Sequence, residues 1–137
     1  MAAEIQTLFG GEWKEYKHEN LEKFLETMGM NVIKRKAAMQ MTPAMTITTE
    51  GDTIKVTLKM GPKTENVSFD LNKEFDSKGM VEGKATATFS DGKLTVNTTP
   101  KDDKKKPVTI SRILVNGEMV QTMVCDGVEG KRIFKKC

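Results

Sequence analysis

Two arginines near the end of the sequence fall among apolar residues of expected strands. Alternate residues of the stretch Pro107–Val115 share one face, and that face carries Val108, Ile110, Arg112 and Leu114. In the last expected strand, Val128–Lys135, Arg132 shares a face with Phe134. Enclosing a guanidinium among apolar side chains is costly unless an anion or a polar group meets it. Because the guanidinium fork donates two parallel hydrogen bonds to a carboxylate, the pattern indicates an arginine pair that binds an acidic ligand.

The pattern alone leaves a second interpretation of the arginines open. Either side chain can lie near a strand end, with its aliphatic part buried and its guanidinium in water. Gln121 alternates with Met119, Met123 and Cys125, so it either adds a polar contact beside the arginines or faces solvent. Arg112, Arg132 and Gln121 are therefore the candidate residues for binding a carboxylate.

The elements that position these residues begin with a short strand and two helices. Trp13–His18 is expected as a strand, and Asn20 is a candidate N-cap for a helix that ends at Gly29. A second helix is expected from Asn31 to about Met41, because Pro43 blocks its continuation. Its apolar positions are Val32, Ile33, Ala37 and Met41.

After Pro43 the pattern changes to short runs that alternate as strands do. These runs are Thr46–Glu50, Thr53–Met60, Glu65–Leu71, Met80–Ser90, Lys93–Thr98, Pro107–Val115, Glu118–Cys125 and Val128–Lys135. The residues between them include Asp91-Gly92, Asn116-Gly117 and Asp126-Gly127, pairs that favour tight hairpin turns. Regular hairpins indicate an antiparallel meander, and closing it into a barrel removes the exposed edges.

Length and composition are those of one ordinary domain. The 137 residues fit a single domain spanning 1–137, with 37% hydrophobic and 30% charged residues. The start has no basic segment followed by a long apolar run, and Cys125 and Cys137 do not form a disulfide framework, so we expect a cytoplasmic protein. The net charge of +3 comes from basic residues mixed with acidic ones, which gives nucleic-acid binding only weak support. We expect no nucleic-acid partner and a monomer.

An enzyme is not expected. His18 is the single histidine, and the sequence contains no zinc-binding spacing, phosphate-binding loop or nucleophile motif. We therefore expect no metal and no cofactor.

The chain resembles the intracellular lipid-binding proteins, which include the cytosolic fatty-acid-binding and retinoid-binding proteins. Four segments carry the resemblance: GEWKEYKHENLEKFLETMG, VIKRKAAMQMTP, ENVSFDLNKEFD and ISRILVNGEMVQTMVCDGVEGKRIFKK. The resemblance implies an all-β fold, a ten-stranded antiparallel up-and-down β-barrel, also called a β-clam, with a helix-turn-helix lid after the first strand. It also implies that Arg112 and Arg132 bind a fatty-acid carboxylate.

Four residues depart from the family pattern. Phe134 stands where many members have a tyrosine that contacts the carboxylate, and Pro62 stands where many have a phenylalanine at the entrance. Glu15 and Leu21 differ from the usual opening. These differences concern the head-group contacts and the entrance rather than the fold.

We expect the ligand to be a long-chain fatty acid or a similar hydrophobic acid, carried without chemical change. Candidate contacts of its tail or of the entrance are Phe24, Met28, Met39, Met41, Met60, Pro62, Met80, Met123 and Phe134. Lys34, Arg35 and Lys36 on the second helix suit transient contact with an anionic membrane surface, although a solvated helix face explains them as well. A retinoid or other hydrophobe carrier of the same family is the alternative. A secreted lipocalin or a nucleic-acid-binding barrel fits the sequence less well.

Overall fold

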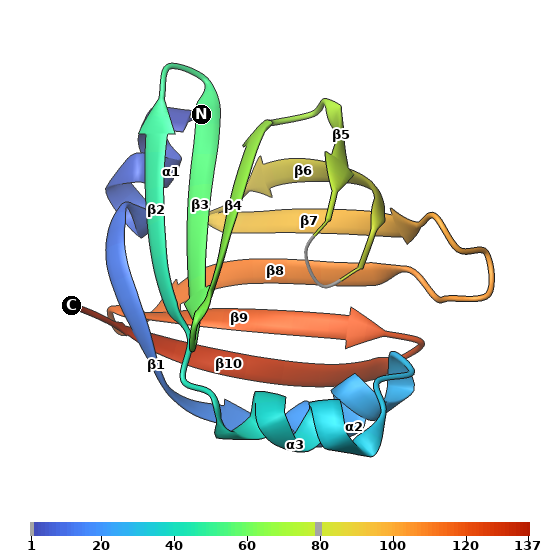
Figure 1. Cartoon of the computed structure of the whole chain (residues 1–137). Coiled ribbons are helices and arrows are strands. Elements are labelled where there is room, and N and C mark those ends of the chain that lie inside the picture. The colour runs from blue at the N-terminus through green and yellow to red at the C-terminus, as the bar shows by residue number, and fades with distance from the viewer. Residues whose placement is uncertain (1, 79–80) are drawn as a thin grey trace.

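The computed structural model describes residues 2–78 and 81–137. Its main element is one antiparallel sheet. Within these residues the sheet has ten strands: β1 Gly11–Glu19, β2 Ala44–Glu50, β3 Thr53–Met60, β4 Lys63–Asp70, β5 Glu74–Ser77, β6 Gly83–Ser90, β7 Lys93–Pro100, β8 Val108–Val115, β9 Glu118–Cys125 and β10 Val128–Lys136. Strands adjacent in sequence pair with each other, except β4 and β5, and β1 pairs with β10. The sheet therefore curls into the expected up-and-down barrel (Figure 1).

Tight turns set the register of three hairpins. Asp91-Gly92, Asn116-Gly117 and Asp126-Gly127 all have positive φ angles, between 51° and 80°. Two successive residues with positive φ form the turn whose twist matches that of paired strands, which is why asparagine or aspartate followed by glycine is favoured there. These turns fix which residues of β6 and β7, and of β8, β9 and β10, face each other, and therefore which ones face inward.

The barrel has a seam between β4 and β5, the two edge strands of the sheet. Phe69 of β4 and Phe75 of β5 stack there, with ring centroids 5.0 Å apart and an interplanar angle of 12°. Side-chain packing thus joins the two edges, which lie at opposite ends of the hydrogen-bonded order.

Two helices follow β1, as expected from the sequence: α2 Leu21–Thr27 and α3 Val32–Gln40. They lie together across one end of the barrel (Figure 1). Phe24 of α2 is fully buried, and a Cβ atom on Gly130 of β10 would lie 2.9 Å from the Phe24 Cβ, so the missing side chain lets α2 lie close to β10. The helix α3 is present as predicted, but its apolar positions do not form a core face, because Val32 and Ile33 are 49% and 79% exposed and no residue of α3 is buried.

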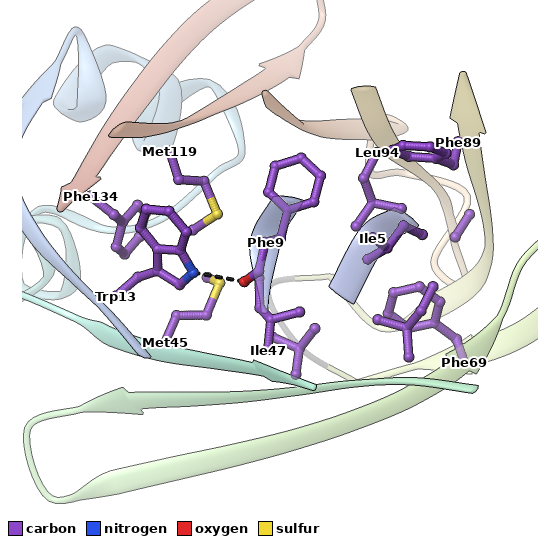
Figure 2. Packing of buried hydrophobic residues seen from close by; sticks show 13 residues of the cluster. Ile5, Phe9, Trp13, Met45, Ile47, Phe69, Phe89, Leu94, Met119 and Phe134 are labelled. Atoms are coloured by element: carbon purple, nitrogen blue, oxygen red, sulfur yellow. Dashed lines mark hydrogen bonds between the residues drawn. The ribbon is translucent and has the colours of Figure 1, made fainter. Parts of the chain in front are cut away.

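A third helix, α1 Ala2–Phe9, precedes β1 and was not expected. It lies beside β2, at the end of the barrel away from α2 and α3 (Figure 1). Ile5 and Phe9 are fully buried in the main core, and the Trp13 Nε1–H donates a 2.8 Å hydrogen bond to the Phe9 carbonyl oxygen (Figure 2). The helix therefore fills part of the barrel interior.

The strand β5 was also missed, because its four residues, EFDS, show no clear alternation. The run expected from Met80 begins as a strand only at Gly83, and Met80 itself lies outside the described residues. Among the helices of the described residues, none is long and apolar enough to cross a membrane.

We expect Phe9→Ala to lower the free energy of unfolding by about 3–5 kcal/mol, because it removes a fully buried aromatic side chain. Urea unfolding followed by the fluorescence of Trp13, the single tryptophan, measures this. Thr7→Ala, at an exposed position of the same helix, should change the value by less than about 0.5 kcal/mol. A loss below about 1 kcal/mol for Phe9→Ala would contradict the docking of α1 in the core.

Candidate functional site

A row of polar side chains crosses three neighbouring strands inside the barrel. Arg112 of β8 lies opposite Gln121 of β9, and Gln121 lies opposite Arg132 of β10. The three residues are 9%, 6% and 5% exposed, respectively. Because each lies on the inward face of its strand, alternation alone accounts for their burial. The two arginines are two strand spacings apart, about 10 Å between backbones.

Arg112 is the arginine that faces a cavity. Its Nε–H donates a 3.2 Å hydrogen bond to Gln121 Oε1, and both residues line a cavity of about 130 Å³. Burial lowers the pKa of Arg112 to about 10, which still leaves it charged at neutral pH. Glu65 also lines the cavity, but its carboxylate lies 3.2 Å from Lys63 Nζ. The remaining guanidinium N–H groups of Arg112 are suited to an acidic group placed in this cavity.

The amide oxygen and the amide nitrogen of Gln121 have different partners. Its Oε1 accepts the hydrogen bond from Arg112, while its Nε2 lies 3.6 Å from Met123 Sδ, a weak acceptor. The amide therefore orients the guanidinium of Arg112 and stays on the inward face, which the sequence pattern left open.

Arg132 has a different partner, which the sequence analysis did not identify. Its Nη1 lies 2.5 Å from Oε2 of Glu15, and the two side chains are 6% and 1% exposed. Glu15 Oε1 is 4.0 Å from Nδ1 of His18, whose side chain is 29% exposed. Glu15 shares the inward face of β1 with the buried Trp13, so period-two alternation was the signal that could have revealed it.

The two buried guanidinium groups are therefore not equivalent. Arg132 is neutralised by a carboxylate of the chain itself, whereas Arg112 is held by a neutral amide. Among the described residues, the buried charged side chains are Glu15, Arg112 and Arg132, which together carry one net positive charge. The interior is thus suited to one monovalent anion.

The cavity beside Arg112 is otherwise mostly apolar. Residues that line it and that were not among the expected ligand contacts include Met45, Leu58, Phe69, Phe75, Val96 and Ile110. They come from β2, β3, β4, β5, β7 and β8, on both sides of the seam. Alternation within β3 and β8 marks Leu58 and Ile110 as inward, but only the curvature of the sheet brings them together.

The residues expected to contact a ligand tail lie elsewhere in the fold. Phe24, Met28, Met39 and Met123 belong to the apolar cluster beneath α2 and α3. Met41 and Met60 are partly buried, and Pro62 is exposed in the turn between β3 and β4.

Phe134 is fully buried in the main core, beside Trp13 and Met119 (Figure 2). The residues that the structure gives for the cavity lining include neither Phe134 nor the other expected tail contacts. The ring of Phe134 accordingly packs with apolar neighbours of the main core.

The cavity is small for a lipid. Ligand pockets of proteins typically measure about 300–1,000 Å³, whereas this one measures about 130 Å³. The side chains of α1 occupy part of the space, since Ile5 and Phe9 belong to the same core cluster as Met45 and Phe69 of the lining. A long acyl chain can enter only if flexible side chains such as Met45 move.

We expect Arg132→Met to lower the free energy of unfolding by about 3–5 kcal/mol, because it leaves the Glu15 carboxylate buried without its partner. The double variant Glu15→Leu/Arg132→Met should recover most of this loss, since an apolar pair carries no desolvated charge. Urea unfolding of both variants measures the difference. Equal destabilisation of the single and the double variant would show that the two groups do not stabilise each other.

Comparison with known proteins agrees with this geometry. Residues 10–136 match the model of the lipocalin / cytosolic fatty-acid binding protein family. The chain therefore belongs to this family of lipid-binding β-barrels, as its four sequence segments indicated.

Particular relatives are similar along nearly their whole length. The intestinal fatty acid-binding protein of Rattus norvegicus is 36% identical over 130 residues, which cover 93% of this chain and 98% of the relative. The structure of apo lipid binding protein 8 of Caenorhabditis elegans has a TM-score of 0.88 at 26% identity, covering 94% of this chain and 95% of that one. The Schistosoma mansoni fatty acid binding protein in complex with arachidonic acid has a TM-score of 0.86 at 25% identity, covering 94% of this chain and 96% of that one.

Proposed function

We propose that this protein binds a long-chain fatty acid inside the barrel and carries it through the cytosol without chemical change. The observation that carries the proposal is Arg112, a buried cation that faces an apolar cavity and is held there by a neutral amide. The names of two of these relatives support the ligand class, since both are fatty acid-binding proteins and one of them is in complex with arachidonic acid.

In this proposal the carboxylate binds Arg112, and Gln121 keeps the guanidinium in position. A carboxylate at Arg112 replaces the water that burial has removed and forms charge-assisted hydrogen bonds. Arg132 contributes less to binding of the carboxylate, because its guanidinium is already paired with the carboxylate of Glu15. In place of the expected arginine pair, the proposal thus has one head-group arginine, Arg112, and one arginine paired within the protein, Arg132.

The acyl chain supplies most of the affinity. Each buried methylene contributes about 0.8 kcal/mol, before the cost of ordering the chain and moving the lining side chains. The head group supplies selectivity, because the Arg112 site is unfavourable for ligands without an acidic group. The stacked rings of Phe69 and Phe75, at the seam between β4 and β5, give the acyl chain an apolar surface to contact.

We expect Arg112→Gln to weaken oleate binding by roughly 10- to 100-fold, corresponding to the loss of about 1.5–3 kcal/mol of charge-assisted hydrogen bonding. Binding of oleyl alcohol, which has the same chain and no charge, should change much less. Isothermal titration calorimetry on delipidated protein measures both. If delipidated wild-type protein binds no fatty acid, the proposed function is wrong.

A retinoid carrier is the alternative within the same family. Displacement of bound oleate by retinoic acid, together with native mass spectrometry of lipid extracted with the purified protein, distinguishes the two. Recovery of fatty acid and weak competition by retinoic acid would support our proposal, and the reverse result would favour the retinoid.

We also propose that α3 contacts membranes during transfer of the ligand. Val32 and Ile33 are exposed apolar side chains, and the exposed Lys34 and Lys36 lie on the same short helix. Arg35 is engaged within the protein, because its Nη1–H donates a 2.9 Å hydrogen bond to the Met30 carbonyl oxygen. The proposed membrane surface is therefore Val32, Ile33, Lys34 and Lys36, without Arg35.

We expect Lys34→Glu/Lys36→Glu to slow transfer of a fluorescent fatty acid to anionic vesicles several-fold, since each lysine near such a surface contributes about 1 kcal/mol. Lys73→Glu/Lys93→Glu makes the same change of charge outside the helices and should leave the rate nearly unchanged. Stopped-flow fluorescence measures the rates. Equal rates for the two double variants would contradict a specific role of α3.

A further inference from the structure

Glu15 is an acid placed inside a barrel that is proposed to bind acids. Its side chain is 1% exposed, with Oε2 at 2.5 Å from Arg132 Nη1 and Oε1 at 4.0 Å from His18 Nδ1. A like charge near a ligand carboxylate is unfavourable unless a cation stands between them. Here Arg132 is that cation.

The backbone places Glu15 where it reaches only one of the two arginines. It lies on β1, which pairs with β10, and the register shift between Glu15 and Lys17 brings His18 opposite Arg132. Arg112 lies two strands beyond Arg132 in the sheet. The carboxylate therefore neutralises the nearer arginine and leaves the farther one beside the cavity.

Holding β1 to β10 does not by itself account for an ion pair at this position. The two strands pair from Trp13–Lys136 to Glu19–Lys131, so backbone hydrogen bonds already join them. Apolar side chains of similar size join such strands as well as a buried ion pair does. Glu15 instead changes the number of unpaired cations that a ligand can contact inside the barrel.

We infer that Glu15 is a specificity-determining residue that limits the cargo to amphiphiles with a single negative charge. The inference rests on the proposed function. A ligand with one carboxylate is satisfied by Arg112. A head group with two negative charges needs the second guanidinium as well, and it obtains Arg132 only by leaving Glu15 buried without its partner.

The length of the arginine side chain makes this competition geometrically reasonable. With backbones about 10 Å apart, the two extended side chains can converge on one head group between them. Gln121 lies between the two arginines on the intervening strand and bonds to Arg112. The protein's own carboxylate is covalently tethered beside Arg132, so a ligand competes with a partner that is always present.

The test compares two ligands with the same chain, oleate and oleyl phosphate, at pH 8, where the phosphate carries close to two negative charges. Isothermal titration calorimetry gives the ratio of the two dissociation constants for the wild type, Glu15→Gln, Glu15→Asp and Glu15→Gln/Arg132→Gln. We expect wild-type protein to prefer oleate. Glu15→Gln should shift the ratio at least tenfold toward oleyl phosphate, because Arg132 then carries an unpaired charge.

The other variants separate this role from a structural one. Glu15→Asp keeps the charge and should keep the wild-type ratio, and the double variant, which lacks Arg132, should return toward it. Circular dichroism checks folding, and Glu15→Met replaces Glu15→Gln if the latter does not fold. If the ratio is unchanged in Glu15→Gln or Glu15→Met while the wild type still binds oleate, this inference is wrong and the proposed function stands. If the wild type binds neither ligand, the proposed function fails and the inference fails with it.

Discussion

A guanidinium removed from water needs a partner, and this requirement explains the arrangement of the barrel interior. Arg132 finds a carboxylate on the neighbouring strand β1, and Arg112 finds an amide on β9. Desolvation lowers the pKa of Arg112, which means that its charge is held at a cost within the fold. Binding an anion relieves that cost. In the proposed function, relief of this cost contributes part of the driving force for head-group binding.

The ion pair between Glu15 and Arg132 also joins the first and last strands, which close the barrel. The strands that carry the head-group residues, β8 to β10, are connected by tight turns, so their register is fixed locally. The lining of the cavity, in contrast, includes residues from both edges of the sheet, β4 and β5. In the proposed binding mode, the head group therefore contacts the regular part of the sheet, and the tail contacts the part held by side-chain packing.

Much of the fold follows from local sequence patterns, and the parts that were missed depend on distant contacts. Asp91-Gly92 and Asn116-Gly117 identify hairpins by themselves, and alternation places Arg112 and Arg132 inward. Alternation with Trp13 marks Glu15 as inward, but its partner Arg132 is 117 positions away in the sequence, so only closure of the barrel brings the two together. The helix α1 is short, and Ile5 and Phe9 are buried because the barrel offers them a core. The methionines named as tail contacts were chosen because they are apolar and flexible. These properties do not distinguish a residue that packs in the core from one that lines a ligand cavity.

The position of α1 has a consequence for the size of the cargo. The helix α1 lies at the end of the barrel away from α2 and α3, and its Ile5 and Phe9 are fully buried in the main core. If the carboxylate binds Arg112 as proposed and the acyl chain extends toward α1, a straight chain that is too long has to bend or displace the helix. In the proposed function, the residues before β1 would therefore limit the length of the ligand, although they lie outside the ten strands that form the barrel.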